Sequence, residues 1–76
     1  MLDLALREPL QDGLNIIKVT ANDSSFATVA LVEVEKVDKD VFCCKDITLV
    51  STVGYIHNRN FVDNAILDYL QKQMIS

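Results

Sequence analysis

Hydrophobic and polar residues alternate most clearly along residues 26–37, which read F-A-T-V-A-L-V-E-V-E-K-V. This stretch is rich in β-branched residues and contains no Gly or Pro, so it predicts the central strand of an antiparallel sheet. Because side chains alternate across a sheet, one face of the strand is apolar throughout and carries Phe26, Thr28, Ala30, Val32 and Val34. The other face is apolar as far as Leu31 and then acidic at Glu33 and Glu35, and we expect its acidic end to meet water.

Two further strands are predicted beside this one. Residues 14–21 follow the turn signal Gln11-Asp12-Gly13, and the turn-forming residues 22–25 join them to the central strand. Residues 38–40, Asp38-Lys39-Asp40, make a similar turn into a third strand that starts at Val41. Residues 41–44 and 47–50 are both strand-like, so the pattern fits one bulged strand or two short ones. The short connections predict an antiparallel β-meander of three to four strands.

Helices are predicted at both ends of the chain. Leu2, Leu4, Ala5 and Leu6 fit one or two helical turns, which Pro9 would stop. The C-terminal helix should run from Phe61 to Met74, with Asn58 or Asn60 as its cap and Asp63 in its first turn. The fold class that follows is α+β, in which the meander is combined with a short N-terminal helix and a C-terminal amphipathic helix packed on one face.

The apolar stripe of the C-terminal helix is wider than contact with one sheet requires. It consists of Phe61, Val62, Ala65, Ile66, Tyr69 and Leu70, and Leu67 and Met74 extend its edge. One interpretation is that a flank of this helix meets a second chain. The other is a well-covered core helix with Leu67 as an isolated exposed residue, which is common in proteins.

Length and composition predict one small domain over residues 1–76 that is well supplied with apolar side chains. A chain of 76 residues buries only roughly 60% of its unfolded surface, which makes a single core marginal. Half of the residues are nevertheless hydrophobic. Such a chain should either pack tightly or share a core with a partner, and we expect a homodimer, the commonest oligomer.

Charge and motif patterns exclude several classes of function. The net charge is −4 and the seven basic residues are scattered, which argues against a nucleic-acid surface. No apolar run is long enough to cross a bilayer, and the first ten residues do not form a secretory signal, so we expect a cytoplasmic protein without membrane contact. The adjacent residues Cys43 and Cys44 are expected to be reduced thiols.

Candidate chemistry is sparse. The single histidine, His57, lies near Arg59, and together with Cys43 or Cys44 it could form a thiolate pair. Glu33 and Glu35 could perform acid/base chemistry, although a solvated strand end explains them more simply. One histidine and two adjacent cysteines lack the spacing of a structural zinc site, and no phosphate loop or nucleophile motif is present. We therefore expect no metal, no cofactor and no catalytic residue.

These patterns favour a small, non-catalytic protein-binding module that inhibits, adapts or regulates a larger protein. Small size and high apolar content of this kind are typical of proteins encoded by phages and mobile elements. The expected interface residues lie on the C-terminal helix and are Leu67, Tyr69, Leu70 and Met74. The alternative is a small-molecule-binding protein or minor enzyme with a site at a dimer interface around His57 and Arg59.

Overall fold

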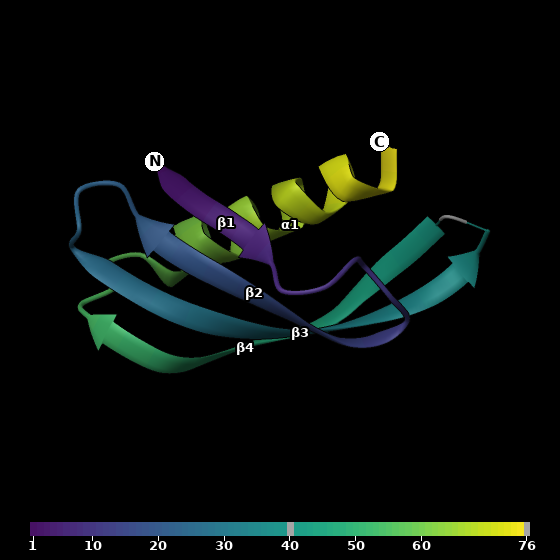
Figure 1. Cartoon of the computed structure of the whole chain (residues 1–76), viewed down its shortest axis with the longest axis horizontal. Coiled ribbons are helices and arrows are strands. Elements are labelled where there is room, and N and C mark those ends of the chain that lie inside the picture. Colours follow the sequence, from purple (N-terminus) through teal and green to yellow (C-terminus); the bar gives the residue numbers. More distant parts are fainter. Residues whose placement is uncertain (40, 76) are drawn as a thin grey trace.

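The computed structural model of the chain describes residues 1–39 and 41–75 as a four-stranded antiparallel sheet and one helix (Figure 1). The elements are β1 (Leu2–Leu6), β2 (Gly13–Ala21), β3 (Phe26–Asp38), β4 (Val41–Gly54) and α1 (Arg59–Ile75). The strand order is β1-β2-β3-β4, so consecutive strands are neighbours. This order confirms the antiparallel meander and the interior position of the strand predicted at residues 26–37. The predicted turn at residues 38–40 includes Asp40, which lies outside the described residues.

The N-terminal segment is a strand, so the predicted N-terminal helix is wrong. Strand β1 pairs with β2 from Leu2 opposite Ala21 to Leu6 opposite Ile17. Its three leucines alternate with period two and pack against the core. Pairing with β2 satisfies backbone groups along the segment, whereas an isolated helix of this length would leave most of its N–H and C=O groups without partners.

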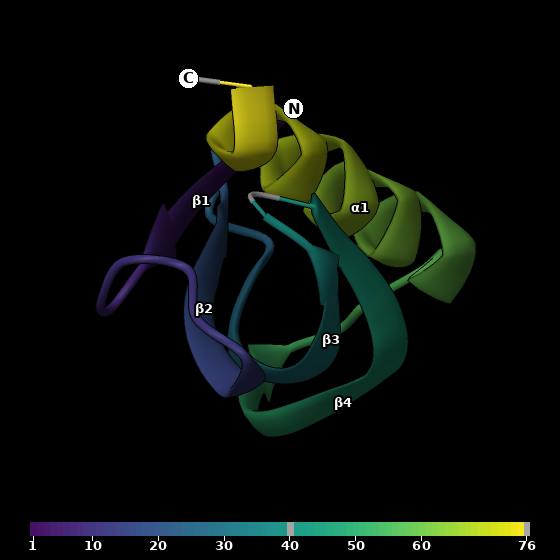
Figure 2. The ribbon, with the colours of Figure 1, turned by 90° about the vertical axis from the view of Figure 1, so that its right-hand side faces the viewer.

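The two faces of the sheet are covered unequally. Helix α1 lies on the concave side of the curved sheet (Figure 2). On β3 the buried residues facing this side are Thr28, Ala30, Val32 and Val34, as the alternation predicted. The core joins them to Ile17 and Val19 of β2 and to Val62, Ile66 and Leu70 of α1. We call the opposite side, which carries Ala27, Val29, Leu31 and Glu33 on β3, the open face, because no helix of the described residues covers it.

Helix α1 begins earlier than predicted. The side-chain Oδ1 of Asn58 accepts a hydrogen bond from the Phe61 N–H at 3.1 Å, so Asn58 is the N-terminal cap. Because the helix starts at Arg59, its first turn contains no acidic residue, and the prediction that Asp63 lies there is wrong. Asp63 instead binds Arg59 one turn away, with Arg59 Nε 2.8 Å from its Oδ1. No helix in the described part of the chain is long and apolar enough to span a bilayer.

Strand β4 is one continuous strand, which resolves the two alternatives for residues 41–50 in favour of a bulged strand. Its pairing with β3 shifts at three places, between Ala27 and Val29, between Glu33 and Val34, and between Lys36 and Asp38. At the first shift Ser51 has a positive φ of 52°, and the Thr28 hydroxyl donates to the Val50 carbonyl at 3.0 Å. Such bulges bend a strand and increase its twist, in keeping with the curvature of the sheet.

Candidate functional site

Strand β1 is an edge of the sheet and directs half of its backbone groups away from β2. The Arg7 N–H donates to the Ile16 carbonyl at 2.9 Å, and the Asn22 N–H donates to the Met1 carbonyl at 3.2 Å. In an antiparallel pair the bonded positions alternate, so the even-numbered residues of β1 turn their N–H and C=O groups outward. The Leu6 N–H follows this rule, because it donates to the Tyr69 hydroxyl at 3.1 Å. The backbone groups of Leu2 and Leu4 therefore also face outward.

A groove with a volume of about 650 Å³ lies between this edge and α1. Leu2 and Leu4 line it from β1, and Phe61, Ala65 and Tyr69 line it from successive turns of the helix. Asp68 and Lys72 also line the groove, and their exposed side chains form an ion pair at 3.2 Å. The groove thus combines apolar walls with outward-facing backbone groups of an edge strand, which is the chemistry that pairing with an added strand requires.

Contacts at both ends of β1 hold the edge strand in position. The side chain of Asn15 is buried and spans the connection between β1 and β2. Its Oδ1 accepts from the Gln11 N–H at 3.0 Å, and its Nδ2 donates to the Gln11 carbonyl at 2.8 Å. At the other end Asn22 Nδ2 donates to Asp3 Oδ2 at 2.8 Å. These bonds hold β1 beside β2, and the bond from the Leu6 N–H to the Tyr69 hydroxyl ties β1 to the helix, so the groove is formed before any partner arrives.

His57 and Arg59 do not converge on a common site. The exposed His57 ring packs edge-to-face against Tyr55, with ring centroids 4.5 Å apart. The guanidinium of Arg59 binds Asp63 and donates from its second terminal nitrogen to the Ile47 carbonyl at 2.9 Å. Arg59 therefore joins α1 to β4. His57 lines a pocket that adjoins the groove at Leu2 and Phe61 and that Arg59 does not line.

The two cysteines lie on opposite faces of β4, as predicted for adjacent strand residues. Cys43 is exposed, whereas Cys44 is partly buried and packs against the core, and both are free thiols. Burial raises the pKa of the Cys44 thiol, and a backbone hydrogen bond at Asp46 offsets only part of this effect. Since a nucleophilic cysteine needs a lowered pKa, this environment does not favour a reactive Cys44.

The described residues show neither a built acid/base site at the acidic pair of β3 nor a metal site. Glu33 and Glu35 are both exposed on the open face, and Glu35 Oε2 lies 3.3 Å from Lys45 Nζ. Within residues 1–39 and 41–75, the His, Cys, Asp and Glu side chains form no group of three or more suited to holding a metal ion. Both glutamates line a pocket of about 340 Å³ together with Asp12 and Lys45. Because both side chains are exposed and neither has a buried partner among the described residues, this pocket gives the acid/base hypothesis little support.

The four helix residues predicted at an interface occupy different environments. Leu70 is 1% exposed and belongs to the core, and Met74 packs against that core from a half-buried position. Tyr69 lines the groove beside β1. Leu67 is 43% exposed on the flank of α1 that faces away from the groove, between the exposed polar residues Asn64 and Gln71. Their role in contacting a partner stays a prediction, and only Tyr69 lies in the groove.

Sequence reasoning missed the edge formed by Leu2 and Leu4, because it assigned that segment to a helix. The alternation of the leucines with Asp3 and Ala5 was the available signal for a strand. Phe61 and Ala65 were placed on the apolar stripe of the helix, yet nothing local indicates that they face β1 rather than the centre of the sheet. No protein-family model, curated protein or solved structure matches this chain.

Proposed function

We propose that this chain is a non-catalytic protein-binding module that binds an extended segment of another protein in the groove between β1 and α1. Binding there would let it inhibit, adapt or regulate that protein. The observation that carries the proposal is the outward orientation of the Leu2 and Leu4 backbone groups beside an apolar groove. In strand addition, main-chain hydrogen bonds supply affinity and pockets for alternate side chains supply specificity.

The groove also limits how the added strand would lie. Tyr69 already accepts the Leu6 N–H, so pairing with the new strand would end at Leu4. Successive side chains of a strand point to opposite sides, so every second residue of the bound segment would face the helix. Those residues would contact Phe61, Ala65 and Tyr69, while the residues between them would face solvent. The bound segment should therefore alternate apolar and polar residues.

The proposal is tested by selecting binders from a displayed library of random linear peptides on the wild-type chain. We expect the selected peptides to show apolar residues at alternate positions and to lose at least about tenfold in affinity when Ala65→Arg fills the groove. Fluorescence polarisation of a labelled selected peptide measures the affinity. Replacing Leu4 with its N-methyl form in a synthetic chain should also weaken binding, because it removes one outward N–H and keeps the side chain.

The matched control is Leu67→Arg, which places the same side chain on the other flank of the same helix. It should leave the affinity of the selected peptides unchanged. A failure of the library to yield binders would contradict the proposal. Binders that are insensitive to both Ala65→Arg and the N-methyl group at Leu4 would contradict it equally, because they would bind elsewhere.

The alternative function, a small-molecule site at His57 and Arg59, has weaker support. It requires an arginine that is free to bind a ligand, whereas the Arg59 guanidinium is bonded to Asp63 and to the Ile47 carbonyl. The groove is therefore the better candidate for the function of the chain.

A further inference from the structure

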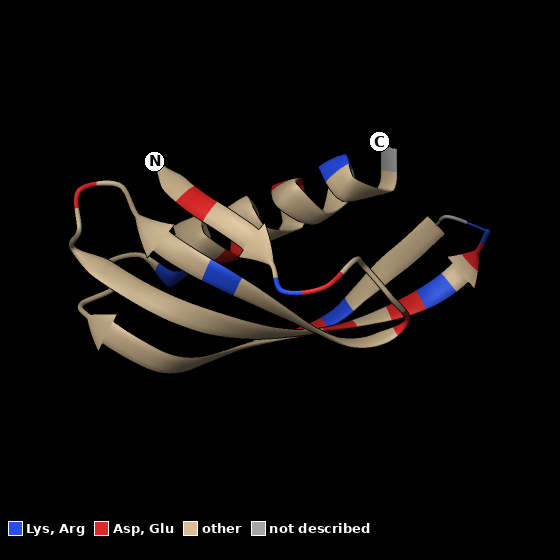
Figure 3. Ribbon diagram, viewed as in Figure 1, with Lys and Arg blue, Asp and Glu red and all other residues tan. Residues whose placement is uncertain are grey.

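The open face of the sheet is apolar at its centre although no described helix covers it. Its apolar residues come from β2, β3 and β4 and are Leu14, Ile16, Ala27, Val29, Leu31, Val50 and Val53. Val53 and Leu14 are 71% and 60% exposed. The face contains no charged residue on β3 before Glu33 or on β4 after Asp46, and Figure 3 shows the corresponding halves of both strands without red or blue. Contiguous exposed apolar surface of this kind marks a site of association.

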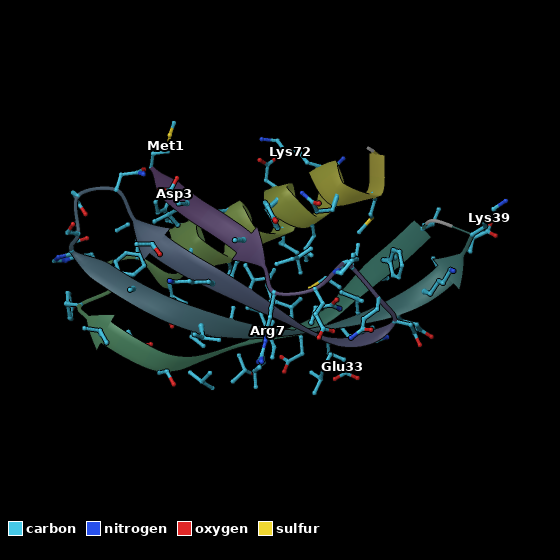
Figure 4. All side chains as sticks on the ribbon, in the orientation of Figure 1. Met1, Asp3, Arg7, Glu33, Lys39 and Lys72 are labelled. Atoms are coloured by element: carbon cyan, nitrogen blue, oxygen red, sulfur yellow. The ribbon has the colours of Figure 1, made fainter. Side chains whose placement is uncertain are left out.

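Two opposite charges bracket this apolar centre. Lys18 of β2 lies opposite Val29, and Glu33 of β3 lies opposite Leu14. We call residues that pair across neighbouring strands a row. The row between the two charges contains Ile16 and Leu31, and the rows of Lys18 and Glu33 are about 13 Å apart along β3. Figure 4 shows Glu33 pointing away from the sheet on the side opposite α1. Within the described residues neither Lys18 nor Glu33 forms an ion pair, so both charges are available to a partner.

We propose that a second copy of this chain covers the open face, with its strands antiparallel to those of the first and a two-fold axis through the row of Ile16 and Leu31. This axis reverses the direction along the strands and places each β2 over the β2 of the other copy. The row of Lys18 then faces the row of Leu14 and Glu33 in the second copy. Lys18 and Glu33 are complementary in this orientation, and the symmetry forms the contact between them twice. The axis also brings Arg7, whose N–H bonds to the Ile16 carbonyl and whose exposed side chain points to this face at its edge (Figure 4), near Arg7 of the second copy.

The opposite orientation is disfavoured by the same charges. A two-fold axis parallel to the strands would place the row of Glu33 and Asp46 on the same row of the second copy, and like charges would face each other. The size of the face fits a weak interface with a second copy. Nine residues of β2, β3 and β4 and the five residues of β1, with strands about 4.8 Å apart, cover roughly 500 Å² in projection. This projected area is well below the roughly 800 Å² of accessible surface per partner in a standard interface, so we expect a weak dimer with a dissociation constant on the order of micromolar.

The test is a charge swap followed by sedimentation equilibrium over a dilution series. The wild-type chain should pass from dimer to monomer on dilution. Lys18→Glu and Glu33→Lys should each weaken the dimer at least about tenfold, because each creates a like-charge contact twice. The double variant Lys18→Glu/Glu33→Lys should recover an affinity within about threefold of the wild type, since it restores both pairs with exchanged signs. Both side chains are exposed, and circular dichroism would verify that each variant folds.

Two controls separate this face from the other surfaces. Leu67→Glu, on α1, should leave the dimer intact, and Leu31→Asp, at the centre of the open face, should abolish it. A wild-type chain that is monomeric throughout the series would overturn the proposal. So would a double variant no stronger than the single ones, or a dimer that is lost on Leu67→Glu and kept on Leu31→Asp. None of these outcomes bears on the groove beside β1, because Ala65 and Leu4 are unchanged in all of these variants.

Discussion

The covered face and the open face of β3 contain similar apolar side chains, yet only one of them is sealed within the chain. Ala30 and Val32 are 0% exposed beneath α1, whereas their sequence neighbours Val29 and Leu31 remain half-buried on the other side. A single helix can cover only one face of a sheet. The high apolar content of this chain is therefore divided between two surfaces, of which one makes the core and the other remains partly exposed.

The largest effect on the free energy of unfolding is expected when two adjacent residues on the two faces of β3 are compared. Val32→Asp would place an unpaired charge in the core and should destabilise the fold by more than about 4 kcal/mol, enough to unfold a domain of this size. Leu31→Asp exchanges a residue of similar type on the open face and should change the free energy of unfolding of the monomer by less than about 1 kcal/mol. Urea titrations followed by circular dichroism, at concentrations below the dimer range, measure both. Equal losses in the two variants would contradict the assignment of the faces.

A smaller effect is expected for the cysteines, which the alternation of β4 also separates. Burial raises the pKa of the Cys44 thiol and also limits the access of reagents to it, whereas Cys43 is exposed. Iodoacetamide should therefore alkylate Cys43 at least about tenfold faster at mildly alkaline pH. Since the raised pKa keeps the Cys44 proton on the folded chain after the unfolded chain has lost it, stability should fall as the pH rises through the thiol range.

The alkylation is best measured by mass spectrometry in the Leu31→Asp chain, where the proposed dimer would not form and could not shield Cys43. The matched variants Cys43→Ser and Cys44→Ser assign each rate to its thiol. Equal rates at the two positions would show that Cys44 is not protected by the covered face.

The smallest effect is expected for the ion pair at the acidic end of the sheet. The side chains of Glu35 and Lys45 are 58% and 53% exposed, and solvent screens the attraction between such groups. Glu35→Gln should change the free energy of unfolding by less than about 0.5 kcal/mol, measured in the same urea titrations. A loss comparable to that of a core substitution would mean that this end of β3 is more enclosed than the exposed fractions indicate.

The features that were predicted correctly depend on patterns that extend over many residues. The alternation over residues 26–37 is long enough to assign both the strand and its two faces. The stripe on α1 repeats over several turns, so the helix and its buried side could be derived as well. By contrast, the first six residues contain too few apolar positions to separate the two periods, because Leu2 and Leu6 fit a helix while Leu2, Leu4 and Leu6 fit a strand. Pairing with β2 decides this choice, and that pairing is not a local property.

The groove could not be derived from the sequence for a related reason. Its two walls, β1 and α1, are separated by most of the chain, and the bond between Leu6 and Tyr69 spans 63 residues. Periodicity indicates which residues of each wall are apolar, but the contact between the walls depends on how the sheet curves. The bulges of β4 at Lys45 and Ser51 contribute to that curvature. The sequence pattern did not decide between one bulged strand and two short strands for residues 41–50, so it could not predict this curvature.

The irregular pairing of β4 also bears on whether copies of this chain can polymerise through their sheet edges. A sheet with two regular edges can extend indefinitely, because the first strand of one copy can pair with the last strand of the next and produce an open-ended ribbon. Here two bulges in β4 and the positive φ of Ser51 interrupt the β4 edge, while β1 remains regular beside its groove. Copies of this chain should therefore resist growing into fibres, because a strand that docks on β1 would extend the sheet at this edge alone.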